Sequence, residues 1–430
     1  MGSPSTDVLV LGAGPAGAAA ALILARKGFS VTVVDQDPKL PGVPGVLLPS
    51  PAWAWLQSLG IWVEEGSDRP SYPCDGLSLV GPEGTPRSFW PTADPRSGCP
   101  TARLARREDL RRRLLAKLEQ SGVQLLRGWE AVTPLWQGKR LVGLRLRTPM
   151  GEETVYHCRV FLDASGQRAF LATRMGWRFP YPKHRKRAEA SLFRGTLPQA
   201  AGTPPHLALV SFRLGWFWFL PLGPDRFTAG VVVEEDAPAA AVGSPGALFF
   251  WALEQCPEAS RLAADAEPLL PFLSLSGFSY RVTKLAGEGF GLVGDAAGFF
   301  DPFPFAGISV ALETGAIAAE DVAEALARRG RVEAHDLAPT VATTRHFQRT
   351  LSGLARALYH QDFLALLLAN SPRWGTSETM SQFFTRRWWD NPWSWQLWRW
   401  NKLRLLAWAQ GLGRTLGVPL VPPLPWAQGR

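Results

Sequence analysis

The chain has 430 residues, of which 46% are hydrophobic and 19% are charged, a composition that is typical of globular proteins and excludes extensive disorder. The net charge of +9 is spread over distant arginine clusters without an aromatic-interleaved recognition motif, so no nucleic-acid partner is expected. The four cysteines and six histidines show no metal-ligand spacing. We therefore expect a reduced, cytoplasmic protein without a structural metal, and no apolar stretch is long enough to span a bilayer.

A strand–helix–strand unit is expected near the start of the chain. Val8–Leu11 is a continuous apolar run, which is typical of a buried parallel strand. A helix is expected over Ala18–Lys27 and a second strand over Val31–Val34, which Asp35 follows. A GxGxxG pattern lies between the first strand and the helix, and in this context it predicts a dinucleotide-binding site.

Each residue of this predicted site has a physical reason. Gly12 permits the tight turn, Gly14 lets a pyrophosphate approach the backbone, and Gly17 lets the helix pack closely on the strand. The helix start beside Ala16 offers free N–H groups and the positive end of the helix dipole to the phosphates. Asp35 can accept hydrogen bonds from an adenosine ribose, and its carboxylate would repel the 2′-phosphate of NADP.

The middle of the chain begins with a stretch rich in proline and glycine and then shows patterns of one helix and three strands. After a stretch rich in proline and glycine, a basic amphipathic helix is expected over Arg103–Leu118. Three strands are then expected over Val123–Leu126, Leu141–Arg147 and Val160–Asp163.

A second domain is expected where the sheet type changes. Trp216–Leu222 and Arg226–Val233 alternate strongly and predict an antiparallel hairpin. Gly291–Gly294 returns to the pattern of a buried strand, Ile308–Arg329 predicts a long alanine-rich helix, and residues 335–412 are predicted to be largely helical.

A second cofactor motif lies far along the chain from the first. The strand that starts at Phe290 ends in Gly294-Asp295, and Gly307 and Ile308 then begin the long helix. A nicotinamide dinucleotide needs one Rossmann half-site. The second motif therefore predicts a longer cofactor that binds in an extended form.

Two further segments complete the pattern, namely Arg107-Glu-Asp-Leu110 and Phe161-Leu-Asp163-Ala-Ser-Gly166. Together the motifs resemble the flavoprotein superfamily of class A flavin monooxygenases, geranylgeranyl reductases and flavin-dependent halogenases. The resemblance implies FAD, with Asp295 on its ribityl chain and Arg107 near its phosphates or ribityl chain. It also implies that the helix start at Gly307 and Ile308 faces the flavin pyrimidine edge, where the helix dipole would stabilise the reduced anion.

The expected fold class is α/β, with a Rossmann-like FAD-binding domain, an inserted antiparallel-sheet substrate domain and a C-terminal helical region. We assign residues 1–70, 101–175 and 283–334 to the discontinuous FAD-binding domain, residues 71–100 and 176–282 to the substrate domain, and residues 335–430 to a helical cap.

Two candidate substrate residues come from a halogenase-like segment. Gly215-Trp216-Phe-Trp218-Phe-Leu-Pro221 is similar to the Trp-x-Trp-x-Ile-Pro signature of the halogenases. This resemblance implies that Trp216 and Trp218 lie beside the substrate. Alternating aromatic residues also pack well on one face of a sheet, so a purely structural role stays open.

One departure argues against halogenation. Halogenases of this type carry a lysine before the Arg107-type helix, but no lysine occurs from Pro41 to Ala116. Arg69 lies in about the right stretch and is a further substrate candidate. However, a guanidinium is always protonated and cannot form a chloramine in the same way.

We therefore expect an FAD-dependent oxidoreductase, monooxygenase-like or reductase-like, that acts on a hydrophobic, aromatic or isoprenoid small molecule. No catalytic acid or base is identified. Because no second Rossmann motif is present, NAD(P)H would bind transiently, or a flavin reductase would deliver reduced flavin. Two alternatives stay open: a flavin-dependent halogenase, and a non-catalytic lipid- or prenyl-binding protein on the same fold.

The C-terminal part is rich in tryptophan. Nine of the 19 tryptophans fall between Trp374 and Trp426, among arginine and lysine, which is typical of a membrane-interface segment. A helical projection of residues 393–412 shows no clean amphipathic stripe, and this favours a helical cap over the substrate pocket. Peripheral membrane contact is the alternative, and it would favour a lipid or isoprenoid substrate.

Overall fold

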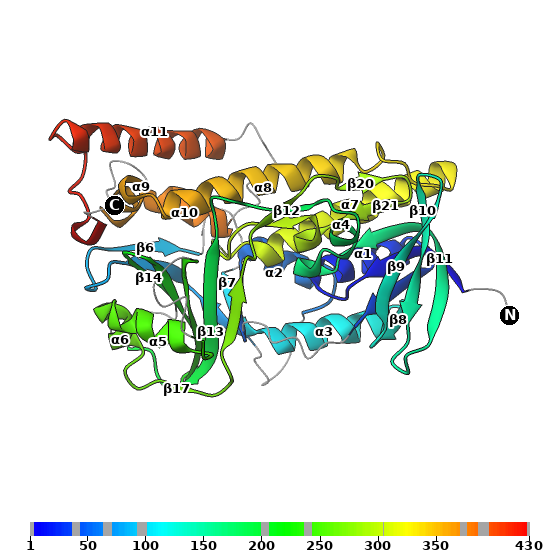
Figure 1. Cartoon of the computed structure of the whole chain (residues 1–430), viewed down its shortest axis with the longest axis horizontal. Coiled ribbons are helices and arrows are strands. Elements are labelled where there is room, and N and C mark those ends of the chain that lie inside the picture. Colours follow the sequence, from blue (N-terminus) through cyan, green and yellow to red (C-terminus); the bar gives the residue numbers. More distant parts are fainter. Residues whose placement is uncertain are drawn as a thin grey trace.

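The computed structural model describes residues 4–36, 44–62, 71–92, 101–198, 206–235, 243–303, 305–369, 376–385 and 395–427. Two large sheets lie toward opposite ends of the long axis (Figure 1). Helix α8, Ala338–Leu358, runs along the top of the molecule, and α11, Trp395–Thr415, lies on the outside.

The first sheet contains the predicted strand–helix–strand unit. Its parallel strands have the order β21-β11-β1-β2-β8. An antiparallel meander of β10 and β9 continues from β11, and β20 pairs with β21 at the edge. The strands are β1 (Ser5–Leu11), β2 (Val31–Asp35), β8 (Gln124–Arg127), β9 (Glu130–Gln137), β10 (Arg140–Arg147), β11 (Glu153–Asp163), β20 (Ala286–Gly287) and β21 (Phe290–Leu292).

Three helices pack on one face of this sheet, and their residues share one core cluster with those of β1 and β2. They are α1 (Pro15–Arg26), α3 (Arg107–Gln120) and α7 (Gly307–Arg329). The backbones of α1 and α7 approach closely, because a Cβ on Gly315 would lie only 2.2 Å from the carbonyl oxygen of Ala16. This contact joins the N-terminal motif to the helix that follows the second motif.

The second sheet has the order β17-β13-β16-β15-β14-β5-β6, with β18 beside β13. The predicted hairpin is confirmed as the antiparallel pair β15–β16. The sheet is otherwise antiparallel, but β5 and β14 run parallel and so need a long connection rather than a hairpin. The strands are β5 (Gly76–Val80), β6 (Arg87–Pro91), β13 (Lys186–Arg194), β14 (His206–Phe212), β15 (Gly215–Pro221), β16 (Arg226–Glu234), β17 (Glu267–Pro268) and β18 (Leu273–Ser276).

Both faces of the second sheet are covered. Phe217 and Phe219 of β15 point to one face, where α5 (Ala247–Glu254) and α6 (Pro257–Leu262) pack. Trp216 and Trp218 point to the opposite face, which we call the inner face. The apolar cluster on the inner face includes residues of three C-terminal helices, α9 (Gln361–Ala369), α10 (Thr376–Thr385) and α11.

Short elements connect the two halves. The predicted helix over Arg103–Leu118 was wrong at its start, because Ala102–Arg106 forms strand β7 between β3 and β4 and the helix begins at Arg107. Ala102, Leu104 and Ala105 of this strand are fully buried, which stabilises it. The remaining elements are β3 (Gly45–Leu48), α2 (Ser50–Ser58), β4 (Ser71–Cys74), η1 (Gly166–Arg168), α4 (Phe170–Arg174), β12 (Arg178–Pro180), β19 (Tyr280–Val282), η3 (Gly294–Ala297), β22 (Gly298–Phe299) and η4 (Pro425–Ala427).

Candidate cofactor and substrate site

Two glycines of the turn after β1 are required by the fold itself. Gly12 has a φ of +106°, and a Cβ there would lie 2.4 Å from the carbonyl oxygen of Ala164. A Cβ on Gly17 would lie 1.9 Å from the carbonyl oxygen of Gly12. Both close approaches exclude any larger residue, whatever binds nearby.

Gly14 is different, because neither its conformation nor its neighbours require glycine. Its φ is −72°, and a Cβ there would meet nothing within 4 Å. The open space lies at the N-terminus of α1, where backbone N–H groups and the helix dipole attract anions. A glycine at this position fits the close approach of a phosphate group.

Asp35 is buried at the end of β2 and holds the glycine turn in place. The backbone N–H of Ala13 donates to Asp35 Oδ2 over 2.8 Å, and Arg111 Nη2 lies 3.1 Å from Asp35 Oδ1. A carboxylate at the end of this strand is the group that accepts a ribose hydroxyl in dinucleotide-binding sites. Arg111 was not predicted as a site residue, although it lies one helical turn after Arg107 on α3.

Arg107 and Asp295 come together from distant parts of the chain. Arg107 is the first residue of α3, and Asp295 lies in η3, directly after β21. Burial raises the pKa of the Asp295 carboxyl to about 6, while the Arg107 charge and a hydrogen bond from Gln167 act in the opposite direction. Burial also lowers the pKa of the Arg107 guanidinium, and Asp295 partly offsets this effect.

Both members of this pair are accessible to a ligand. Arg107 is exposed and Asp295 is only partly buried within the described residues. A bound molecule could therefore contact the guanidinium and the carboxyl group together. Gln167 was not among the predicted site residues, although it directly follows the Asp163-Ala-Ser-Gly166 segment.

Gly294 brings the second motif against the first. Its φ is +59°, and its N–H donates to Thr314 Oγ1 over 3.0 Å. A Cβ on Gly294 would lie 3.0 Å from the Cβ of Ala16 and 3.5 Å from the Cβ of Ala311. The glycine turn, Asp295 and the start of α7 therefore meet at the carboxyl ends of the parallel strands β1 and β21.

The start of α7 also has space for a ligand. Gly307 is exposed, and a Cβ there would meet nothing within 4 Å. Ile308 beside it is only partly buried. One residue further, Ser309 Oγ is buried and makes no hydrogen bond within the described residues. Because an unpaired buried hydroxyl is costly, a polar ligand group at this helix start would satisfy it.

Taken together, these observations fit an extended dinucleotide such as FAD. Gly14 leaves space for phosphates, Arg107 supplies a cation, and Gly307 leaves space at a second helix N-terminus. Open space at two separate helix N-termini suits a cofactor longer than a mononucleotide, which needs one such terminus.

The predicted substrate residues Trp216 and Trp218 share the inner face of the second sheet. They are 1% and 5% exposed, and their ring centroids lie 5.6 Å apart. The ring of Trp216 also lies 6.2 Å from that of Phe303 and 6.1 Å from that of Phe305. Trp216 therefore adjoins the segment that leads into α7. The third candidate, Arg69, lies outside the described residues.

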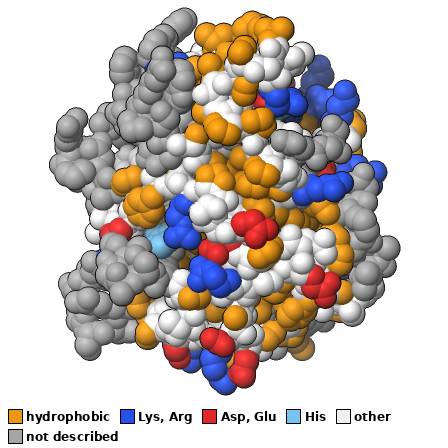
Figure 2. All heavy atoms as spheres, turned by 90° about the vertical axis from the view of Figure 1, so that its left-hand side faces the viewer, with side chains coloured by type: hydrophobic (Ala, Val, Ile, Leu, Met, Phe, Trp, Pro, Cys, Tyr) orange, Lys and Arg blue, Asp and Glu red, His pale blue; other side chains and the backbone are white. Residues whose placement is uncertain are grey.

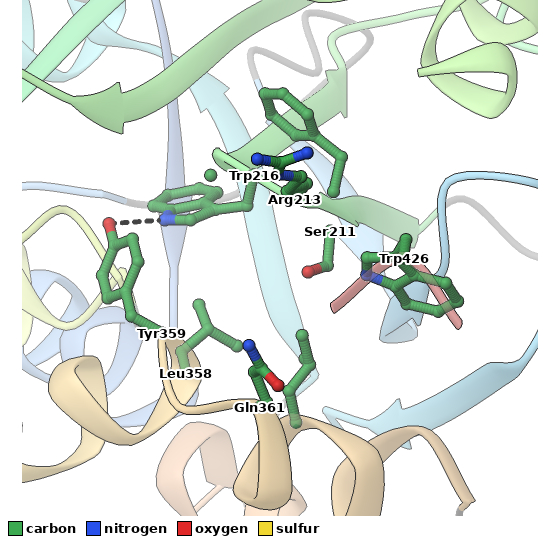
Figure 3. Close-up of a pocket in the computed structure, with 10 residues that line it drawn as sticks. Ser211, Arg213, Trp216, Leu358, Tyr359, Gln361 and Trp426 are labelled. Carbon is green, nitrogen blue, oxygen red and sulfur yellow. Dashed lines mark hydrogen bonds between the residues drawn. The ribbon is translucent and has the colours of Figure 1, made fainter. Parts of the chain in front are cut away.

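A buried hydrogen-bond network fixes Trp216. Its Nε1–H donates to the Tyr359 hydroxyl over 2.8 Å (Figure 3). This hydroxyl donates to Asp301 Oδ2 over 3.1 Å. His184 Nε2 lies 2.8 Å from the same Asp301 oxygen. Burial raises the pKa of Tyr359 well above its usual value, so the hydroxyl stays protonated. No sequence pattern marks His184 or Tyr359, because only the tertiary fold brings them to Asp301.

A small cavity lies beside this network, between the β14–β15 hairpin and the junction of α8 and α9 (Figure 3). Ser211, Gln361 and Trp426 line it together with Trp216 and Tyr359. Its volume of about 30 Å³ is on the scale of one water molecule. This cavity is therefore too small for an organic substrate.

The described part of the chain contains neither a metal-ligand cluster nor a membrane-spanning helix. Its His, Cys, Asp and Glu side chains form no group of three or more that could hold a metal ion. None of its helices is both long enough and apolar enough to cross a membrane.

Comparison with known proteins gives consistent relatives. Residues 7–201 match the family described as FAD dependent oxidoreductase. A menaquinone reductase of Mycobacterium tuberculosis is 30% identical over 330 residues, which cover 74% of this chain and 76% of that protein. A 1H-pyrrole-2-carbonyl-(peptidyl-carrier protein) brominase of Pseudoalteromonas luteoviolacea is 28% identical over 330 residues, which cover 75% of this chain and 78% of that protein.

Among solved structures, that of a flavin-dependent brominase is similar with a TM-score of 0.80 and 22% identity, over 93% of this chain and 98% of that one. At this identity the similarity concerns the fold. The two relatives named above are enzymes, and this favours an enzyme over the non-catalytic lipid-binding alternative.

Proposed function

This chain belongs to the FAD-dependent oxidoreductases, and we propose that it oxygenates or reduces a hydrophobic small molecule, aromatic or isoprenoid, beside Trp216 and the start of α7. Bound FAD supplies the redox chemistry, because its ring system carries electron pairs that no side chain can carry. The observation that carries the proposal is the series of ligand-compatible positions from Gly14 through Arg107 and Asp295 to Gly307.

We assign the cofactor contacts as follows. The N-terminus of α1 at Gly14 would hold the phosphates, with Arg107 neutralising part of their charge. Asp35 would accept a ribose hydroxyl, and Asp295 would accept hydroxyls of the ribityl chain. The helix start at Gly307 would face the ring system, where its dipole favours a reduced, anionic ring.

The inner face would provide a dry wall for the substrate. Trp216 and Phe305 adjoin the start of α7, and both are at least partly buried among apolar side chains. The hydrogen bond from Trp216 to the Tyr359 hydroxyl, which in turn donates to Asp301, holds the ring of Trp216 in one orientation. Such a wall excludes water and positions an apolar molecule without supplying an acid or a base. NAD(P)H, or reduced flavin from a partner reductase, would supply the electrons.

Halogenation is the second candidate, and the Trp216-to-Pro221 segment together with the brominase similarity favours it. Halogenation needs a lysine beside the substrate, and we consider Lys186 for this role because it is buried. Its side chain is 3% exposed, and its Nζ lies 3.6 Å from the ring centroid of Tyr359. However, Lys186 Nζ forms an ion pair with Glu234. This pairing stabilises the ammonium form, which cannot act as a nucleophile.

The first experiment is a visible spectrum of the purified protein with and without added FAD, followed by NADH and NADPH titration under nitrogen. We expect a flavin spectrum and, after reduction, oxidation of the flavin by a hydrophobic quinone or by O₂ with an aromatic substrate. A protein that stays colourless with excess FAD would overturn the assignment. Trp216→Phe should lower turnover at unchanged flavin content, whereas Phe217→Leu, on the opposite sheet face, should not.

A second experiment separates the two candidates. Products of the reduced enzyme with O₂ and phenol, pyrrole or indole substrates are compared by mass with and without bromide. We expect no bromide-dependent mass gain. A brominated product that disappears in Lys186→Met, at unchanged flavin content, would establish halogenation and assign the amine to Lys186.

A further inference from the structure

Helix α11 exposes a row of large apolar side chains. Leu405, Trp408, Leu412 and Leu416 have exposed fractions of 62%, 65%, 46% and 68%, and their spacing places them along one face of the helix and the turn that follows it. We call these four residues the α11 stripe. Val418 and Leu420, which are also exposed, extend it. Contiguous apolar surface of this kind marks an interaction site.

The position of α11 leaves this stripe exposed on the surface of the molecule. The helix lies on the outside of the molecule (Figure 1), and Figure 2 shows hydrophobic side chains gathered at the top of the face drawn there. The opposite side of α11 is buried through Leu403, Ala407 and Gln410. Arg414 Nε also lies 3.1 Å from Asp362 Oδ1 on α9. The stripe is therefore not needed to attach α11 to the rest of the chain.

This arrangement explains why a helical projection of the segment shows no single amphipathic stripe. Helix α11 has two apolar sides, one buried on α9 and one exposed. A helix that only capped the substrate domain would need the first side alone.

Charge identifies the partner that fits the exposed side. Residues 391–430 contain no Asp or Glu, whereas α11 contains four basic residues. By helical geometry, Arg404 and Lys402 flank the stripe on its two sides. An apolar strip with an interfacial tryptophan and basic flanks is complementary to the surface of an anionic lipid bilayer.

We propose that the α11 stripe docks the protein on anionic membranes, with α11 lying in the plane of the bilayer surface. The contact is peripheral, since no described helix could cross the membrane. It also has a consequence for the substrate, which rests on the proposed function. Leu403 and Ala407 of α11 belong to the same apolar cluster as Trp216 and Trp218, so docking would bring the inner face near the bilayer that dissolves an isoprenoid molecule.

The test is co-sedimentation of the full-length, FAD-supplemented protein with vesicles of phosphatidylcholine alone and of phosphatidylcholine with one quarter phosphatidylglycerol. Wild type should partition onto the anionic vesicles. The double substitution Trp408→Ser and Leu412→Ser should lower the partition coefficient at least about tenfold, because it removes two apolar side chains. Arg404→Gln should lower it about fivefold on anionic vesicles and leave binding to neutral vesicles unchanged.

Met150→Ser is the matched control, because Met150 is 88% exposed but lies in the turn between β10 and β11. It should bind vesicles like wild type. The proposal would be overturned if the stripe variant bound vesicles like wild type, or if Met150→Ser lost as much binding as the stripe variant. It would also be overturned if wild type did not bind vesicles and the stripe variant converted a dimer into a monomer. Flavin content, measured in every variant, is independent of these outcomes and reports on the proposed function alone.

Discussion

Asp295 imposes a specific pH dependence on the stability of the flavin-free protein. Burial raises the pKa of its carboxyl from the ordinary 3.8 to about 6 in the folded state. The folded chain therefore binds more protons than the unfolded chain between about pH 4 and pH 6. By linkage, the free energy of unfolding falls as the pH rises through this window and levels off above it.

The size of this change in the free energy of unfolding follows from the pKa shift of Asp295. For a folded pKa of about 6, protonation of Asp295 adds about 1.4 kcal/mol to the free energy of unfolding at pH 5 relative to pH 8. Asp295→Asn removes this contribution because an amide does not titrate. Arg107 then loses its opposite charge, which changes the level of stability but not its slope, since the guanidinium stays protonated throughout.

The assay is urea unfolding of flavin-free wild type and Asp295→Asn at pH 5, 6, 7 and 8. The difference between the two free energies of unfolding should change by about 1.4 kcal/mol across this range, in favour of wild type at low pH. Asp225→Asn is the control, because Asp225 is 68% exposed and should follow wild type. Parallel profiles for wild type and Asp295→Asn, or a difference with the opposite slope, would refute the reasoning.

Two further predictions concern the other parts of the site. Gly14→Val should reduce retained FAD to less than about one tenth of the wild-type amount, because the side chain fills the space for the phosphates. Gly243→Val, another position with open space around the Cβ, should keep its flavin, and flavin retained in both variants would contradict the phosphate assignment. Tyr359→Phe should lower the free energy of unfolding by about 1–3 kcal/mol, because Trp216 Nε1 and Asp301 each lose a buried partner. An unchanged urea midpoint would show that the network does not stabilise the fold.

The cofactor half of the molecule could be predicted because its signals are local. The strand, the glycine turn, the helix and Asp35 follow one another within about thirty residues, and each glycine reflects a contact or a space at its own position. The prediction of a Rossmann-like fold and of an FAD-dependent oxidoreductase superfamily was confirmed on this basis. The places of Arg107 and Asp295 beside FAD are implied by the family resemblance rather than by spacing, and the electrostatic pairing of the two residues was not predicted.

The substrate half could not be predicted to the same depth, because its contacts join distant segments. Ala102–Arg106 reads as the start of a basic helix, and only pairing with β3 and β4 makes it a strand. His184, Asp301 and Tyr359 are far apart in sequence and meet only in the folded chain. The two apolar sides of α11 cancel in a helical projection, and only the packing on α9 tells them apart.

The close contact between α1 and α7 has a consequence for the order of events during synthesis. The two halves of the proposed FAD site are joined where Gly315 meets Ala16 and where Gly294 lies against the same residue. β21, which leads into the second half, takes its place beside β11 only after the intervening sheet has been translated. A nascent chain would therefore hold an incomplete site until α7 has left the ribosome, and we expect cofactor loading to be a late step in the maturation of this protein.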